Sequence, residues 1–125
     1  MKRIKNIINF IKKYNTYFFI LLLICIFIIA LDPSRSIDKM FLETHDKIKH
    51  IFAFFIVSFF FIENSDIKLN IYIKTILLFL FALSLEIVQK IIGRSSVDFY
   101  DFLASSLGIL VFLLLRHILK KLIEK

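Results

Sequence analysis

Residues Tyr14 to Leu31 read YNTYFFILLLICIFIIAL, and they contain no charged side chain in eighteen positions. Lys12 and Lys13 stand directly before this block. Because an α-helix rises about 1.5 Å per residue, the block nearly crosses a hydrocarbon core of about 30 Å. Pro33 stops the helix just beyond it. We therefore expect a membrane-spanning helix over residues 14–31.

A basic segment before an apolar run is also typical of a secretory signal peptide. However, no small-x-small cleavage motif precedes Asp32. Cys25 follows Ile24, which is too bulky for the residue that precedes a lipoprotein cysteine. We predict that the first helix is retained in the mature protein.

The composition of the whole chain leads to the same compartment. Hydrophobic residues make up 59% of the 125 residues and sixteen residues are Phe, whereas soluble proteins are roughly 45–50% apolar. A soluble core of this size could not bury so much apolar surface, so lipid is the expected solvent. Disorder, a disulfide-stapled secreted domain and a zinc finger are excluded, since the chain has one Cys and little polar low-complexity sequence.

Three more apolar blocks follow, at residues 51–62, 75–85 and 102–115. Each is too short to span by itself and becomes a span only when charged neighbours enter its ends. We expect these helices at about 46–62, 71–92 and 99–119. The sequence thus predicts one all-α integral membrane domain over residues 1–125, a bundle of four transmembrane helices.

The charges predict an orientation for these four helices. Eleven Lys and Arg residues fall on the side that holds both termini and the 63–70 turn, against six on the other side. By the positive-inside rule both termini are cytoplasmic. The basic pI of about 9.6 then reflects topology and anionic lipid headgroups, and no nucleic-acid partner is expected.

Most acidic residues fall on the predicted outer side, several at helix ends. Three spacings place polar side chains on shared helix faces there: Asp46 with His50, Glu86 with Gln89, and Asp101 with Ser105. Arg94, in the turn that follows the third helix, can pair with Asp98 or Glu86. Asp98, Asp101, Ser105 and Gly108 project within roughly an 80° sector of one helix. Since isolated charges facing lipid are costly, we expect these groups to gather in one outer cluster. The candidate site residues are Asp46, Lys47, His50, Glu86, Gln89, Arg94, Asp98, Asp101 and Ser105.

Three interpretations of this cluster are open. It could be an interhelical network that only holds the bundle together. It could bind a phosphate- or amine-bearing headgroup, with Lys47 and Arg94 holding the anion. It could also be catalytic, with His50 as general base oriented by Asp46 or Glu86. A metal site formed by His50 with the acids is a less favoured variant, because a single His gives no diagnostic ligand spacing. We therefore predict no metal and no cofactor.

The ordered set of polar residues resembles a known family. Asp46-Lys47-Ile48-Lys49-His50, then Glu86, Gln89, Arg94, Asp98, Asp101 and Gly108, is similar to the pattern of the VanZ-like family of small bacterial membrane proteins. The resemblance covers about residues 30–115. The family usually has Asn three residues before the final Gly, and this chain has Ser105 there.

The resemblance implies a multi-pass protein of the bacterial cytoplasmic (inner) membrane. It also implies a function at the cell envelope, because the family takes its name from a member associated with teicoplanin resistance. We therefore expect a protein that recognises a lipid headgroup or lipidated compound through the outer cluster. The alternatives are a small membrane enzyme that acts on an envelope lipid and a structural accessory subunit. Membrane lipids are the expected partners, and a transport pore would require a homo-oligomer.

Overall fold

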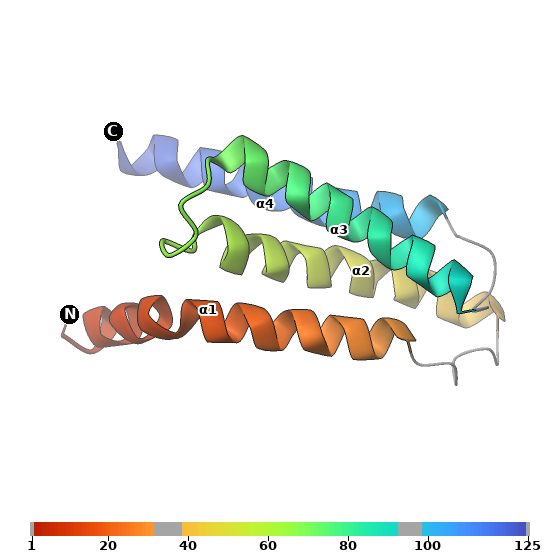
Figure 1. The fold of residues 1–125 in the computed structure, drawn as a ribbon. Coiled ribbons are helices and arrows are strands. Elements are labelled where there is room, and N and C mark those ends of the chain that lie inside the picture. Colours follow the sequence, from red (N-terminus) through yellow and green to blue (C-terminus); the bar gives the residue numbers. More distant parts are fainter. Residues whose placement is uncertain (1, 32–38, 93–98, 125) are drawn as a thin grey trace.

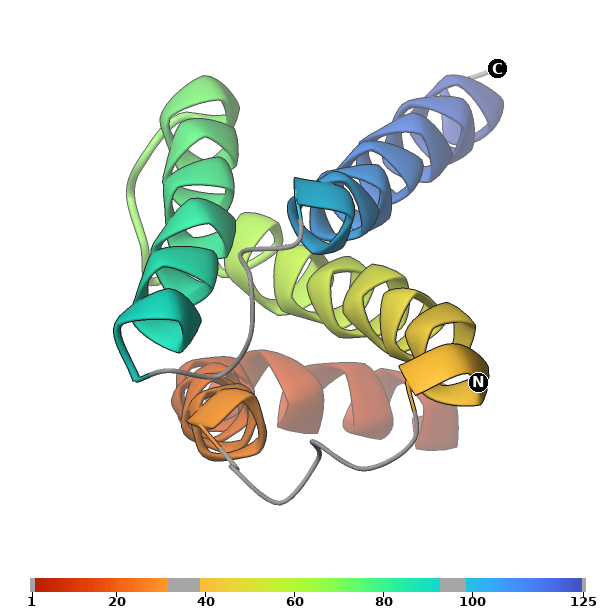
Figure 2. The same cartoon turned by 90° about the vertical axis from the view of Figure 1, so that its right-hand side faces the viewer.

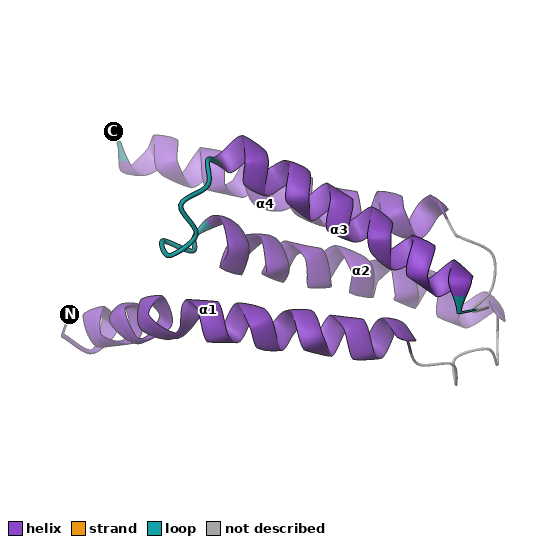
Figure 3. Ribbon diagram, viewed as in Figure 1, coloured by secondary structure: helices purple, strands orange, loops and turns teal. Residues whose placement is uncertain are grey.

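The computed structural model describes the backbone of residues 2–31, 39–92 and 99–124, with side chains except at 2, 4, 30, 31 and 39–46. This described part is all helical and contains no strand (Figure 3). The helices are α1 (Lys2–Leu31), α2 (Lys39–Ile62), α3 (Ile71–Ile91) and α4 (Phe99–Ile123). They run alternately up and down, so the two ends of the chain lie at the same end of the bundle as the turn between α2 and α3 (Figure 1).

α3 matches its expected range to within one residue, whereas α1, α2 and α4 extend past theirs. α1 begins at Lys2, α2 begins at Lys39 and α4 ends at Ile123. The length of an apolar block indicates how much of a helix can lie in the hydrocarbon core. The helix itself continues into the flanking charged residues, because its backbone hydrogen bonds do not require apolar side chains. The early part of α1 also turns away from the axis of the rest of that helix (Figure 2).

Three of the described helical segments are long and apolar enough to cross a membrane. They are Lys5–Ile29, Ile71–Ile91 and Phe99–Ile123, and α2 is not one of them. Their outward side chains are large and apolar: Ile76 is 58% exposed and Leu110 is 52% exposed. Such a surface is unfavourable in water but suits lipid, so these helices indicate a membrane protein.

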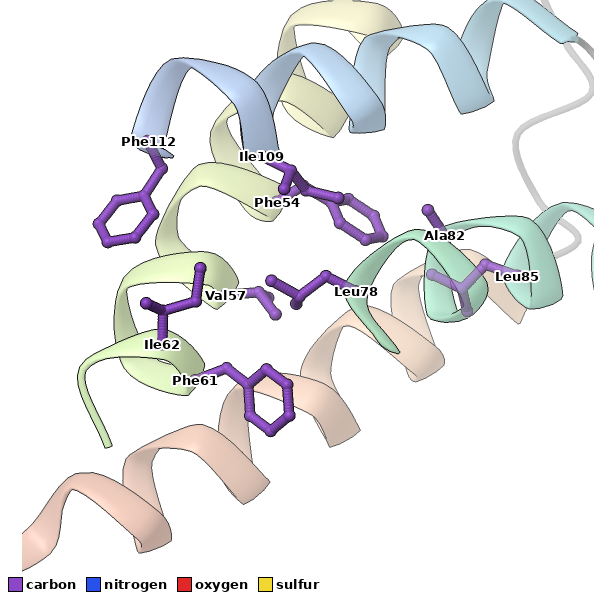
Figure 4. Packing of buried hydrophobic residues seen from close by; sticks show 9 residues of the cluster. All are labelled: Phe54, Val57, Phe61, Ile62, Leu78, Ala82, Leu85, Ile109 and Phe112. Atoms are coloured by element: carbon purple, nitrogen blue, oxygen red, sulfur yellow. The ribbon is translucent and has the colours of Figure 1, made fainter. Parts of the chain in front are cut away.

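The core lies where α2 meets the other helices. α2 packs against α1, α3 and α4, and in Figure 2 it runs between α1 on one side and the α3–α4 pair on the other. The buried cluster draws side chains from three helices (Figure 4). They are Phe54, Val57, Phe61, Ile62, Leu78, Ala82, Leu85, Ile109 and Phe112. α1 joins from outside, for example by stacking Phe19 on Phe61 with ring centroids 5.1 Å apart.

Gly108 sets how closely α4 approaches α2. A Cβ atom at this position would overlap the backbone carbonyl of Ile51 and would lie 3.1 Å from the backbone nitrogen of Phe55. Only a residue without a side chain allows this approach. Ser105 is buried on the same face of α4, so the close crossing brings the first half of α4 against α2.

The turn between α2 and α3 is held by a set of contacts that we call the Lys74 network, formed by Thr16, Asn64, Asp66 and Lys74. Lys74 lies in the first turn of α3 and is only 4% exposed. Its Nζ donates hydrogen bonds to the carbonyl of Ile62 at 3.0 Å and to that of Asn64 at 2.9 Å. Lys74 therefore caps the C-terminus of α2, where carbonyls lack helical partners and a positive charge is favourable.

The same network also fastens α1. Asn64 donates through Nδ2 to the Thr16 hydroxyl at 3.1 Å, and Thr16 donates to a carboxylate oxygen of Asp66 at 2.8 Å. Beside it, Arg116 of α4 pairs with Glu63. Side chains from α1, α3, α4 and the turn thus meet at this end, beside the last carbonyls of α2.

Candidate ligand site at the opposite end of the bundle

Three ligand-type side chains meet at the other end of the bundle, each from a different helix. They are His50 of α2, Glu86 of α3 and Asp101 of α4, and their nearest ligand atoms all lie within 4.8 Å of one another. We call this set the three-helix cluster. It joins residues that are far apart in the sequence, so it exists only because the helices pack.

Helical spacing explains why these three side chains converge. On α2, His50 precedes the buried Phe54 by four residues. On α3, Glu86 follows the buried Ala82 by four, and on α4, Asp101 precedes the buried Ser105 by four. Residues four apart share a helix face. Each polar side chain therefore continues the core-facing stripe of its own helix by one turn.

The three side chains of the cluster are buried to different extents. Glu86 is only 3% exposed, while His50 and Asp101 are half-buried. Two carboxylates so close together repel each other, and burial strengthens the repulsion. The arrangement therefore favours a positively charged group or hydrogen-bond donors between them.

Ser105 orients the imidazole of His50. Its Oγ lies 3.1 Å from His50 Nδ1, and its side chain is 1% exposed. This contact leaves Nε2 as the nitrogen available to a further partner. A serine this deeply buried has no access for a substrate, so its geometry fits an orienting role rather than that of a nucleophile.

Lys47 adds a positive charge beside the cluster. It is one turn before His50 on α2, and its Nζ lies 5.6 Å from the ring centroid of Tyr100 on α4. A cation over an aromatic face is favourable by about 0.5–1 kcal/mol at exposed sites. Gln89 is half-buried, three residues after Glu86 on α3. Lys47, Glu86, Gln89, Tyr100 and Asp101 are all engaged by neighbouring groups.

The structure thus brings part of the predicted set together. His50, Glu86, Asp101 and Ser105 meet, and Lys47 lies beside them over Tyr100. Arg94 and Asp98 lie outside the described residues, and so does the side chain of Asp46.

Two features were not predicted from the sequence. Tyr100 was not among the candidate site residues, and Lys74 was counted only among the eleven basic residues on the predicted cytoplasmic side. The capping role of Lys74 had one signal in the sequence, its position four residues after Asn70, the N-cap of α3. A Lys there can reach back to the end of the preceding helix, but nothing in the local pattern shows that it is buried.

The arrangement offers one imidazole nitrogen and two carboxylates to a common point, with a lysine ammonium beside it. It could hold a cation, accept hydrogen bonds from an amine, or move a proton through His50. No protein-family model, curated protein or solved structure matches this chain.

Proposed function

We propose that this chain is a VanZ-like protein of the bacterial cytoplasmic membrane that recognises the phosphate-bearing headgroup of a lipid or lipidated compound. The four helices would all span, with both termini cytoplasmic and the three-helix cluster facing outward. The observation that carries the proposal is the meeting of His50, Glu86 and Asp101 from three helices at one end of the bundle.

The depth of the cluster supports a headgroup ligand. Glu86 lies five residues before the end of α3 at Ile91, which is about 8 Å along the helix axis. The interfacial region of a bilayer is roughly 5–8 Å thick on each side. We place the last turn of α3, which carries Lys90, among the headgroups. The cluster then lies near the level of the glycerol linkage, and the exposed apolar faces of α3 and α4 contact acyl chains.

The charges support a phosphate-bearing ligand with a positive partner. Lys47 supplies an ammonium beside the cluster, and Arg94 follows α3 in the sequence, so both could hold a phosphate. The carboxylates of Glu86 and Asp101 would take a positive group that accompanies it. Teicoplanin-type glycopeptides are lipidated compounds that act at this membrane face, and resistance to them is the role that the family resemblance implies.

Binding to defined lipids tests the proposal. The purified chain in detergent is titrated with short-chain lipids that carry phosphoethanolamine, phosphoglycerol or no phosphate. We expect saturable binding of the phosphate-bearing lipids, and at least tenfold weaker binding of the phosphoethanolamine lipid for Glu86→Gln, because its ammonium loses a carboxylate partner. Glu63→Gln is the matched control at the opposite end and should bind like the unmodified protein. Equal affinity for all three lipids, or no effect of Glu86→Gln, would overturn the proposal.

The orientation has its own test. In a Cys25→Ser background, Ser96→Cys and Glu124→Cys are treated in whole cells with a membrane-impermeant maleimide. We expect Ser96→Cys to react directly and Glu124→Cys to react only after the cells are permeabilised. The reverse pattern would place the cluster on the cytoplasmic side and remove its access to the outer leaflet.

The second candidate function is a small membrane enzyme that acts on an envelope lipid. The hydrogen-bond distance between His50 Nδ1 and Ser105 favours it, because an oriented imidazole next to carboxylates can serve as a general base. Turnover of a bound phospholipid that His50→Gln abolishes, with binding retained, would support the enzyme. Binding without turnover supports recognition alone, and loss of abundance without either would support an accessory structural role.

A further inference from the structure

We infer that the three-helix cluster binds a divalent first-row metal ion, of the Zn²⁺ or Mn²⁺ class, through His50, Glu86 and Asp101. The inference deepens the proposed function, on which it rests in one respect: the ion would be the positive partner that links the carboxylates to a headgroup phosphate. The sequence places these residues in the expected outer cluster but shows no metal-ligand spacing, because the three donors come from three separate helices.

The distances approach those around an ion of this size. Metal–nitrogen and metal–oxygen bonds to such ions are about 2.0–2.2 Å, so two donors on one tetrahedral ion are about 3.3–3.6 Å apart. The cluster atoms all lie within 4.8 Å of one another. Binding of an ion would draw the three side chains closer to a common point.

The donor set fits the charge and the chemistry. A neutral imidazole with two carboxylates carries a charge of −2, which a divalent ion balances. Imidazole suits Zn²⁺ and carboxylates suit Mn²⁺, whereas Ca²⁺ and Mg²⁺ prefer oxygen ligands only. Glu86 is only 3% exposed, so the attraction between its carboxylate and the ion is stronger than it would be in water. Because Glu86 and Asp101 are already engaged by neighbouring groups, the ion would join or exchange those contacts.

Ser105 supplies the second interaction that such sites use. A metal-bound His typically donates its other ring N–H to an oxygen, which fixes the tautomer and the ring orientation. His50 Nδ1 lies 3.1 Å from Ser105 Oγ, which directs Nε2 to the ion. Three protein ligands leave a fourth position open, and a phosphate oxygen beside Lys47 could fill it.

Metal binding can be measured directly on the full chain. The detergent-purified protein is stripped with chelator, desalted and titrated with Mn²⁺, followed by the loss of the free-ion paramagnetic resonance signal. We expect one Mn²⁺ per chain that Zn²⁺ displaces and excess Mg²⁺ does not. His50→Ala and Glu86→Gln should weaken binding at least tenfold, while His117→Ala, which changes an exposed His of α4, should leave it unchanged.

A second readout needs no variant. In protein labelled with ¹⁵N-histidine, bound Mn²⁺ should show a hyperfine coupling to one directly bonded ring nitrogen. Absence of saturable binding, or binding without that coupling, would overturn the metal site. Phosphoglycerol lipid binding with and without chelator separates the two proposals. Lipid binding that persists without any metal site leaves the proposed function standing alone. Metal binding without lipid binding would contradict the proposed function and support the metal site.

Discussion

At the 63–70 end of the bundle, Lys74 directs its ammonium to two backbone carbonyls and thereby closes one helix end against another. At the opposite end, His50, Glu86 and Asp101 direct their ligand atoms at one another. The first arrangement uses a charge to complete hydrogen bonds of the backbone, so it stabilises the fold. The second places two negative groups together, which by itself costs free energy. Polar groups in the same small bundle thus serve stability at one end and, we propose, ligand binding at the other.

The largest effect on stability is expected from Lys74→Met. The substitution keeps an apolar stem but leaves the carbonyls of Ile62 and Asn64 without their donor, which should lower the free energy of unfolding by about 2–5 kcal/mol. Thermal unfolding in detergent would measure the change. Lys68→Met, at an exposed position of the same turn, is the control and should stay within about 0.5 kcal/mol of the unmodified protein. Equal effects of the two would show that the Lys74 network does not stabilise the fold.

Gly108→Ala tests the crossing on which the three-helix cluster depends. The added methyl group overlaps the Ile51 carbonyl, so α4 must move away from α2 at a cost of about 1–3 kcal/mol. The displacement also separates Ser105 from His50, so we expect weaker lipid and Mn²⁺ binding in the remaining folded protein. Leu110→Ala, on an exposed face of α4, should preserve binding. Unchanged stability and binding in Gly108→Ala would contradict the close crossing.

Ser105→Ala tests whether the Ser105 hydroxyl orients His50 in the three-helix cluster. Loss of the hydroxyl removes the orienting contact to His50, and changes of this kind typically weaken metal binding by about 10–100-fold; we expect a value at the lower end. Mn²⁺ titration measures it. Ser58→Ala removes an equally buried hydroxyl whose contact is to the Phe54 carbonyl, and it should leave the Mn²⁺ affinity unchanged. If both substitutions weaken binding alike, the His50–Ser105 contact has no specific role.

The smallest effect is expected from Tyr100→Leu. This change removes the aromatic face beneath the Lys47 ammonium, which is worth about 0.5–1 kcal/mol. Lipid affinity should fall a few-fold in the titration, while Tyr100→Phe should retain it. A larger loss in Tyr100→Phe would mean that the hydroxyl, and not the ring, is what the site uses.

Much of the helical architecture is readable in the sequence, because uncharged blocks mark α3 and α4 and the first span. The starts of α1 and α2 could not be predicted from the apolar pattern, because both helices begin in segments that contain charged residues. The spacing of His50, Glu86 and Asp101 places each on a core-facing stripe. The contact of His50 with Ser105 joins positions 55 residues apart. It depends on the register of α2 against α4, which Gly108 sets and which no local pattern encodes.

The burial of Lys74 could not be predicted from the sequence for a related reason. In a sequence, a lysine at a helix start is typical of a charge at the membrane surface. Only the path of the 63–70 turn brings the last carbonyls of α2 within its reach. The span count, the orientation and the family resemblance stay predictions, and the maleimide and lipid experiments address them.

The most direct test of the contrast between the two ends is to compare thermal unfolding and phosphoethanolamine lipid binding in Glu86→Gln and Lys74→Met. If the account is right, Glu86→Gln loses at least tenfold in lipid affinity and unfolds near the temperature of the unmodified protein, because glutamine keeps the shape of the side chain and its capacity for hydrogen bonds. Lys74→Met then unfolds at a much lower temperature, and its folded fraction still binds the lipid. If Glu86→Gln instead lowers the unfolding temperature as much as Lys74→Met and leaves lipid affinity unchanged, the three-helix cluster only holds the bundle together.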